Sequence, residues 1–115
     1  MSTETQTKSC LLIDDLRVPG DAGNKKNIPA HAAVARTYDE GIKMLGAQHW
    51  DVLYLDHDLA DFSGPEGRER KGIHVLDWLE EFPQHLPGEI IIVSDNAGGV
   101  GPMRRLVSKL YGGDY

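Results

Sequence analysis

Three short apolar runs each end in polar side chains, and this pattern constrains the fold more than any other feature of the chain. The runs are Cys10–Ile13, Asp51–Leu55 and Ile90–Val93. Their nearly unbroken apolar character is typical of strands covered on both faces, as in a parallel sheet. Because the carboxyl ends of parallel strands lie along one edge, the polar side chains that follow should converge in one site. These side chains are Asp14, Asp15, Asp56, His57, Asp58, Ser94 and Asn96.

The segment between the first two strong runs is predicted to be mostly loop. Residues 16–29 contain two prolines, two glycines and two asparagines without a helical apolar pattern, so we expect a long loop there. Residues 32–37 are predicted to form a weak second strand. A second polar, glycine-rich insert at residues 61–72 lies beside the Asp56–Asp58 tip. It is either a mobile lid that brings Arg68, Arg70 and Lys71 to an anionic ligand, or a solvated loop.

Helical apolar spacing recurs in three segments, at residues 39–47, 73–82 and 102–111. Asp39 is expected to cap the first helix, Pro102 to occupy the first position of the last one, and Gly112 to end it. Strands and helices therefore alternate along the chain. This order predicts an α/β fold with a right-handed parallel sheet of about four strands and helices on both faces.

Length and charge narrow the class of protein. A chain of 115 residues supports one domain, which we place at residues 9–115 after a polar tail at residues 1–8. A net charge of −6 argues against non-specific binding to nucleic acid or anionic membranes. No run approaches the ~18 apolar residues of a membrane span. The single cysteine, Cys10, is expected to be a buried thiol, and a cytoplasmic location fits these features.

The acidic strand tips predict a magnesium site. Neighbouring carboxylates repel one another, so a semi-buried cluster is best tolerated around a cation. Mg²⁺ prefers carboxylate, water and phosphate oxygens, and Asp14, Asp15 and Asp56 are the expected ligands. The alternative is that Asp14 or Asp15 only caps a turn and Asp56 only accepts loop N–H bonds. A zinc site is disfavoured because the five histidines lack the spacing of zinc ligands.

The remaining polar residues indicate phosphate chemistry. His57 is a candidate general acid or base oriented by a carboxylate, or else a partly buried histidine bonded to the backbone. Ser94 and Asn96 can donate hydrogen bonds to phosphoryl oxygens. Gly98 and Gly99 precede the last predicted helix, whose free N–H groups suit an anion.

The same residues resemble a known family. Asp14 and Asp15 after the first strand, Asp56 after the third and Ser94 after the fourth are similar to the response-regulator receiver domain. The resemblance implies that the first pair binds Mg²⁺, that Asp56 accepts a phosphoryl group and that Ser94 contacts it. The chain departs from receivers because it has neither a fifth strand nor a lysine after a strand, and because a loop replaces the first helix.

A narrower resemblance accommodates these departures. The segments Leu12–Pro19, Ala35–Thr37, Leu55–Leu59 and Ser94–Gly99 resemble the cyclic-phosphate processing receiver-like domains. That family lacks the fifth strand, and the resemblance implies action on cyclic phosphate ends of RNA in repair settings. One departure is Val93, where the resemblance leads us to expect a histidine. His57 therefore becomes the more important candidate for a histidine role in the site.

The expected function is Mg²⁺-dependent hydrolysis or transfer of a cyclic or terminal phosphate, with an RNA 2′,3′-cyclic phosphate as the candidate substrate. The expected site residues are Asp14, Asp15 and Asp56 for the metal, Asp56, His57 and Asp58 for catalysis, and Arg17, Ser94, Asn96, Gly98 and Gly99 for the phosphate. One alternative is a non-catalytic receiver-like module that docks a phosphorylated ligand or a protein partner. Another is phosphorylation of Asp56 itself.

Overall fold

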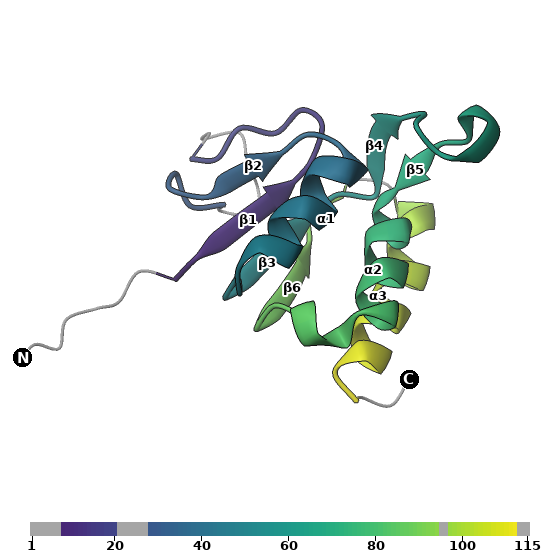
Figure 1. Cartoon of the computed structure of the whole chain (residues 1–115). Coiled ribbons are helices and arrows are strands. Elements are labelled where there is room, and N and C mark those ends of the chain that lie inside the picture. Colours follow the sequence, from purple (N-terminus) through teal and green to yellow (C-terminus); the bar gives the residue numbers. More distant parts are fainter. Residues whose placement is uncertain (1–7, 21–27, 95–96, 113–115) are drawn as a thin grey trace, which may run out of the picture.

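The computed structural model describes residues 8–20, 28–94 and 97–112 (Figure 1). At its centre lies a parallel sheet of four strands in the order β2-β1-β3-β6. These strands are β1 (Cys10–Ile13), β2 (Ala33–Ala35), β3 (Val52–Leu55) and β6 (Glu89–Ile92). The receiver-like α/β sheet predicted from the sequence is thus confirmed. Of the tail expected at residues 1–8, only Lys8 lies within the described residues.

The strand register brings the predicted tips together. Backbone hydrogen bonds continue one residue beyond the strands, from Asp14 N to the Ala35 oxygen (3.1 Å) and from Asp56 N to the Ile13 oxygen (3.0 Å). Val93 N donates in the same way to the Leu55 oxygen at 3.0 Å. Because the ladder holds the ends of neighbouring strands level, the residues that follow them share one edge of the sheet.

The two faces of the sheet are covered differently. The helices α1 (Tyr38–Ala47), α2 (Gly72–Glu81) and α3 (Ala97–Leu110) all contribute to one core cluster, which includes Leu11 and Leu53. The opposite face carries a second cluster around Leu12 and Tyr54, closed by Ile28 and Ala32 from the loop before β2. We expected helices on both faces. Among the described residues a loop segment covers the second face instead, since the Pro/Gly/Asn-rich sequence replaces a helix there.

Two helix starts differ from the prediction. Thr37 caps α1, its side chain accepting a hydrogen bond from Glu40 N at 3.2 Å, whereas Asp39 lies inside the first turn. Asp39 therefore acts near the positive end of the helix dipole rather than as the cap. The helix α3 begins at Ala97, so Pro102 lies inside it. Glycine-rich sequence is a poor helix former, but packing of Val100 and Met103 into the core outweighs that propensity. Gly112, with φ +77°, ends this helix as expected.

The second insert contains regular structure that the sequence did not reveal. Strands β4 (Asp58–Asp61) and β5 (Arg70–Lys71) form an antiparallel hairpin at the end of the sheet above α2, with the single turn η1 (Pro65–Gly67) between them (Figure 1). A second short turn, η2 (Pro83–His85), follows α2. None of the helices in the described part of the chain is both long enough and apolar enough to cross a membrane.

Candidate functional site

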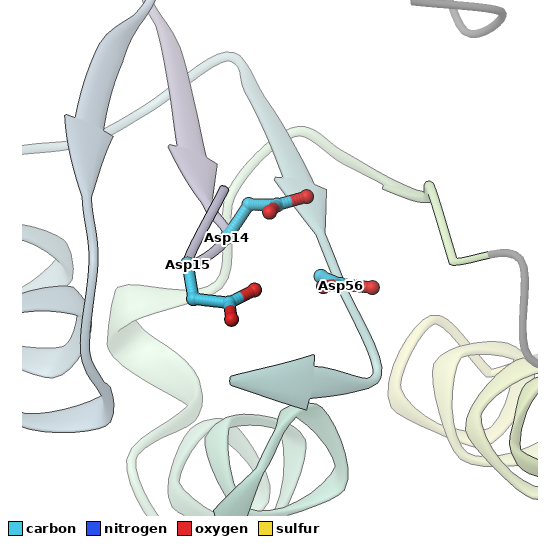
Figure 2. Close-up of side chains that lie close together, drawn as sticks. All are labelled: Asp14, Asp15 and Asp56. Atoms are coloured by element: carbon cyan, nitrogen blue, oxygen red, sulfur yellow. The ribbon is translucent and has the colours of Figure 1, made fainter. Parts of the chain in front are cut away.

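The carboxylates predicted to bind a metal converge at the ends of β1 and β3. One oxygen from each of Asp14, Asp15 and Asp56 lies within 4.8 Å of the others, and the side chains approach the same space from the two strand ends (Figure 2). Asp14 and Asp56 are buried, with 1% and 7% exposure. Asp15 is partly exposed. Proximity and burial together make this a site of strongly negative potential.

The pKa of Asp56 reflects its burial and the charges of its neighbours. Burial, followed by the nearby charge of Asp14, raises the pKa of Asp56 to about 6, although Arg17 and a hydrogen bond from His57 N oppose the shift. A bound divalent cation would offset the negative charges of the carboxylates, which repel one another. The three oxygens, their mutual distances and the raised pKa therefore fit a hard, oxygen-ligated cation such as Mg²⁺.

Asp14 also has the structural role that the alternative interpretation gave it. Its Oδ1 atom accepts hydrogen bonds from Leu16 N (2.9 Å) and Arg17 N (3.0 Å), which closes a turn. Its Oδ2 atom pairs with the Arg17 guanidinium at 2.7 Å, and the same Nη1 atom lies 3.5 Å from Asp56 Oδ1. Asp56 Oδ1 accepts a hydrogen bond from His57 N at 2.9 Å. Thus Arg17, expected to bind phosphate, joins two of the carboxylates in this structure.

Arg36 supports this arrangement and was not recognised as a site residue from the sequence. Its Nη1 atom donates to the Arg17 backbone oxygen at 2.7 Å and to the Asp14 oxygen at 3.2 Å. The end of β2 is thereby tied to the turn after β1. The position of Arg36 near the end of the strand predicted at residues 32–37 was the available signal, because the carboxyl end of that strand lies at the same edge of the sheet as the acidic tips.

The carboxylates open into a pocket of about 630 Å³. The pocket is lined by Asp14, Asp15, Leu16, Arg17, Asp56, Asp58, Ala60, Phe62, Glu69 and Ser94. Six residues predicted from the sequence thus share this space, whereas Leu16, Ala60, Phe62 and Glu69 were missed. Leu16 and Phe62 did carry a signal, since each is a large apolar residue within a polar segment.

His57 and the predicted glycines lie outside that lining. His57 Nδ1 is 2.8 Å from Asp58 Oδ1, which makes an imidazole–carboxylate pair. The His57 ring packs against the first turn of α3, where a Cβ atom on Gly99 would overlap it. Gly99 therefore provides room for His57, and Gly98 is exposed in the same turn. Asn96 lies outside the described residues.

The basic residues of the second insert do not line the pocket either. Arg68 is exposed and lies 3.6 Å from Glu66, whereas the Arg70 guanidinium lies over the Tyr38 ring at 4.4 Å from its centroid. Lys71 N donates to His74 Nδ1 at 2.8 Å, at the start of α2. None of the three basic residues thus belongs to the lining of the pocket in this structure, and their contact with an anionic ligand stays a prediction. The hairpin contributes Asp58, Phe62 and Glu69 to the pocket instead.

Comparison with known proteins assigns the family. Searches of curated proteins and of solved structures gave no match. The family model described as "Cyclic-phosphate processing Receiver domain" matches residues 10–109. This range includes all four strands of the sheet, the helices α1 and α2, α3 except its last residue, and every residue that lines the pocket. The chain belongs to the cyclic-phosphate processing receiver family.

Proposed function

We propose that this protein processes a cyclic or terminal phosphate in a Mg²⁺-dependent reaction, with an RNA 2′,3′-cyclic phosphate as the candidate substrate. The observation that carries the proposal is the convergence of Asp14, Asp15 and Asp56 in the lining of the pocket. Membership in the cyclic-phosphate processing family supports the substrate class.

The three carboxylates would hold the metal. When bound, Mg²⁺ would supply electrostatic stabilisation of the phosphoryl oxygens and lower the pKa of a coordinated water. Without a cation, the pocket repels a phosphate because its acidic residues outnumber Arg17. Metal dependence is therefore expected at the level of phosphate binding as well as of turnover.

Two polar groups of the chain would contact the phosphate. Ser94, at the end of β6, lines the pocket and its hydroxyl can donate to a phosphoryl oxygen. The Arg17 guanidinium lies at the carboxylate cluster, where its Nη1 atom joins Asp14 and Asp56, and its positive charge would attract the phosphate. Both groups would stabilise negative charge that develops on the phosphate during the reaction.

Proton transfer is assigned to Asp58 rather than to His57. The Asp58 carboxylate is about half exposed, at 52%, and lines the pocket, whereas His57 contacts it from outside the lining. Asp58 would accept the proton of an attacking water or hydroxyl group. His57 would act as a positioning residue, because its Nδ1 atom holds Asp58 at 2.8 Å.

Phosphorus NMR tests the proposal directly. A short RNA that ends in a 2′,3′-cyclic phosphate is incubated with the protein, with and without Mg²⁺. We expect Mg²⁺-dependent conversion of the cyclic phosphate signal and its loss in Asp56→Asn. The variant Asp77→Asn, which removes an exposed carboxylate on α2, is the matched control and should retain conversion.

The other outcomes identify the alternatives. Conversion that persists in Asp56→Asn contradicts the assigned site. A Mg²⁺-dependent shift of the signal without conversion favours a non-catalytic module that docks a phosphorylated ligand. A mass increase of one phosphoryl group after incubation with a small phosphodonor would instead identify Asp56 as a phospho-acceptor.

A further inference from the structure

We propose that the pocket also binds the nucleoside that carries the phosphate, with its base stacked on Phe62 and bounded by Leu16. This inference rests on the proposed function of the same site and specifies its substrate class. The ligand is a nucleoside phosphate whose base contributes to affinity, rather than a phosphate recognised alone.

The apolar wall of the pocket is the first observation. Leu16 and Phe62 are exposed to 79% and 64%, and both line the pocket that contains the carboxylate cluster. A single exposed apolar side chain is ordinary on a protein surface. Two of them beside a predicted phosphate site provide a surface for the apolar part of a ligand whose charged part binds the metal.

The backbone around Phe62 is held in place by α1. Asp61 Oδ2 accepts a hydrogen bond from Tyr38 N at 2.9 Å, and Asp61 Oδ1 accepts one from Ser63 N at 3.0 Å. Arg70, on the neighbouring strand, covers the Tyr38 ring. Both neighbours of Phe62 are thus fixed while its ring remains exposed. The backbone that carries the ring is therefore ordered before a ligand stacks on it.

The size of the pocket allows a base as the occupant. Its volume of about 630 Å³ falls within the range of roughly 300–1,000 Å³ of small-molecule sites and leaves room beyond a phosphate and its metal. Nucleobases stack on aromatic rings with little sequence preference, because every base has a π-face. Purines should bind more tightly than pyrimidines, since they cover more of the Phe62 ring.

Calorimetric titration in the presence of Mg²⁺ tests this inference with two ligands. One is adenosine 2′,3′-cyclic phosphate, and the other is glycerol 1,2-cyclic phosphate, which has the same five-membered cyclic ester without a base. We expect the nucleotide to bind about tenfold more tightly, as one stacked base provides. Phe62→Ala should remove this difference, whereas Phe62→Trp should preserve it.

The chain offers a matched control in its second phenylalanine. Phe82 is also partly exposed but lies at the end of α2, beside Trp78 and outside the pocket lining. Phe82→Ala should therefore leave both affinities unchanged. Saturation-transfer NMR on the wild-type protein provides a second readout, in which the base protons should receive more saturation than the ribose protons.

The results separate this inference from the function on which it rests. Equal affinity of the two ligands for the wild type, or saturation confined to the ribose, overturns base recognition while cyclic-phosphate binding stands. If neither ligand binds the wild type, the proposed function fails and the base subsite fails with it. If Phe62→Ala also fails to bind the base-free ligand, this variant no longer reports on the base alone. The saturation pattern of the wild type then shows whether the base contacts the protein.

Discussion

Arg17 offsets part of the negative charge of the acidic residues around it in the absence of metal. The guanidinium Nη1 atom joins Asp14 Oδ2 and Asp56 Oδ1, at 2.7 and 3.5 Å, in the same cluster that is expected to hold Mg²⁺. Metal and arginine therefore compete for the same carboxylate charge. Binding of a cation should release part of the guanidinium for interaction with the phosphate.

Replacement of Arg17 tests this competition. Arg17→Gln should increase the affinity for Mg²⁺ alone by about tenfold, the effect of 1.4 kcal/mol, because a competing positive charge is removed. The same variant should bind the cyclic phosphate more weakly at saturating Mg²⁺, since a phosphate ligand is lost. Calorimetry at pH 8 measures both affinities. A decrease in Mg²⁺ affinity would show that Arg17 organises the metal ligands rather than competing with the metal.

The raised pKa of Asp56 predicts how stability depends on pH. In the metal-free folded protein this pKa is about 6, above the usual carboxyl value of 3.8, so the folded state retains a proton that the unfolded state releases. Stability should therefore fall as pH rises from about 4 to about 6. Asp56→Asn removes this dependence on pH. Its free energy of unfolding should exceed that of the wild type by on the order of 2 kcal/mol above pH 7, and the two should not differ near pH 4.

Urea unfolding in the presence of a chelator measures this difference. Mg²⁺ added at pH 7.5 should then stabilise the wild type more than Asp56→Asn, because the cation offsets the carboxylate repulsion. A stability difference that does not change between pH 4 and pH 7 would show that Asp56 does not carry the raised pKa.

At the scale of elements, the start of α2 is packed directly against the strand tip that carries the site. Gly72 N donates to the His57 oxygen at 2.8 Å, and a Cβ atom on Gly72 would overlap the Asp56 carbonyl oxygen and approach the Met103 side chain. Only a glycine permits this approach of the helix to the backbone of the site. The position of the Asp56 carbonyl is thus fixed partly by α2.

A pair of glycine substitutions tests the importance of this contact. Gly72→Ala should lower the free energy of unfolding by roughly 1–3 kcal/mol, because the helix must move away from the Asp56 carbonyl. Gly46→Ala is the control, since Gly46 is exposed in α1 and its Cβ would meet only Trp78 at 3.9 Å. It should stabilise the protein by about 0.5–1 kcal/mol through higher helix propensity. Thermal unfolding distinguishes these opposite signs.

At the scale of the molecule, the second face of the sheet depends on loop residues rather than on a helix. Ile28 is only 2% exposed and closes the cluster that contains Cys10, Leu12 and Tyr54. Since Cys10 is the single cysteine of the chain, its thiol reports on the opening of this face. Burial, followed by the charge of Asp51, raises the pKa of Cys10 and further reduces its reactivity.

A shorter side chain at position 28 should therefore weaken the packing on this face of the sheet. We expect Ile28→Ala to cost about 2–4 kcal/mol in stability because a buried side chain leaves a cavity. The labelling of Cys10 by a disulfide reagent should become correspondingly faster under native conditions. Unchanged labelling together with unchanged stability would show that the loop does not seal the sheet.

The sequence itself determined the parallel sheet and most of the acidic site. Apolar runs that end in aspartates specify buried strands with charged ends, and in parallel strands those ends must share one edge. Asp14, Asp15, Asp56, Asp58 and Ser94 were therefore found without knowledge of the structure, and the structure brings all of them into one pocket. The acidic cluster and the family followed from the same pattern.

Only the tertiary structure decided which segments cover each face of the sheet. It also decided which side chains from distant parts of the chain are in contact. Local propensity predicted the wrong cap for α1. It also predicted that α3 begins later than it does, because packing of Val100 and the His57 contact with Gly99 stabilise a glycine-rich first turn. The hairpin that holds Phe62 depends on Asp61, whose hydrogen bond to Tyr38 N spans 23 residues. Such contacts leave no periodic signal in the sequence, since they arise from the close approach of segments that are distant along the chain.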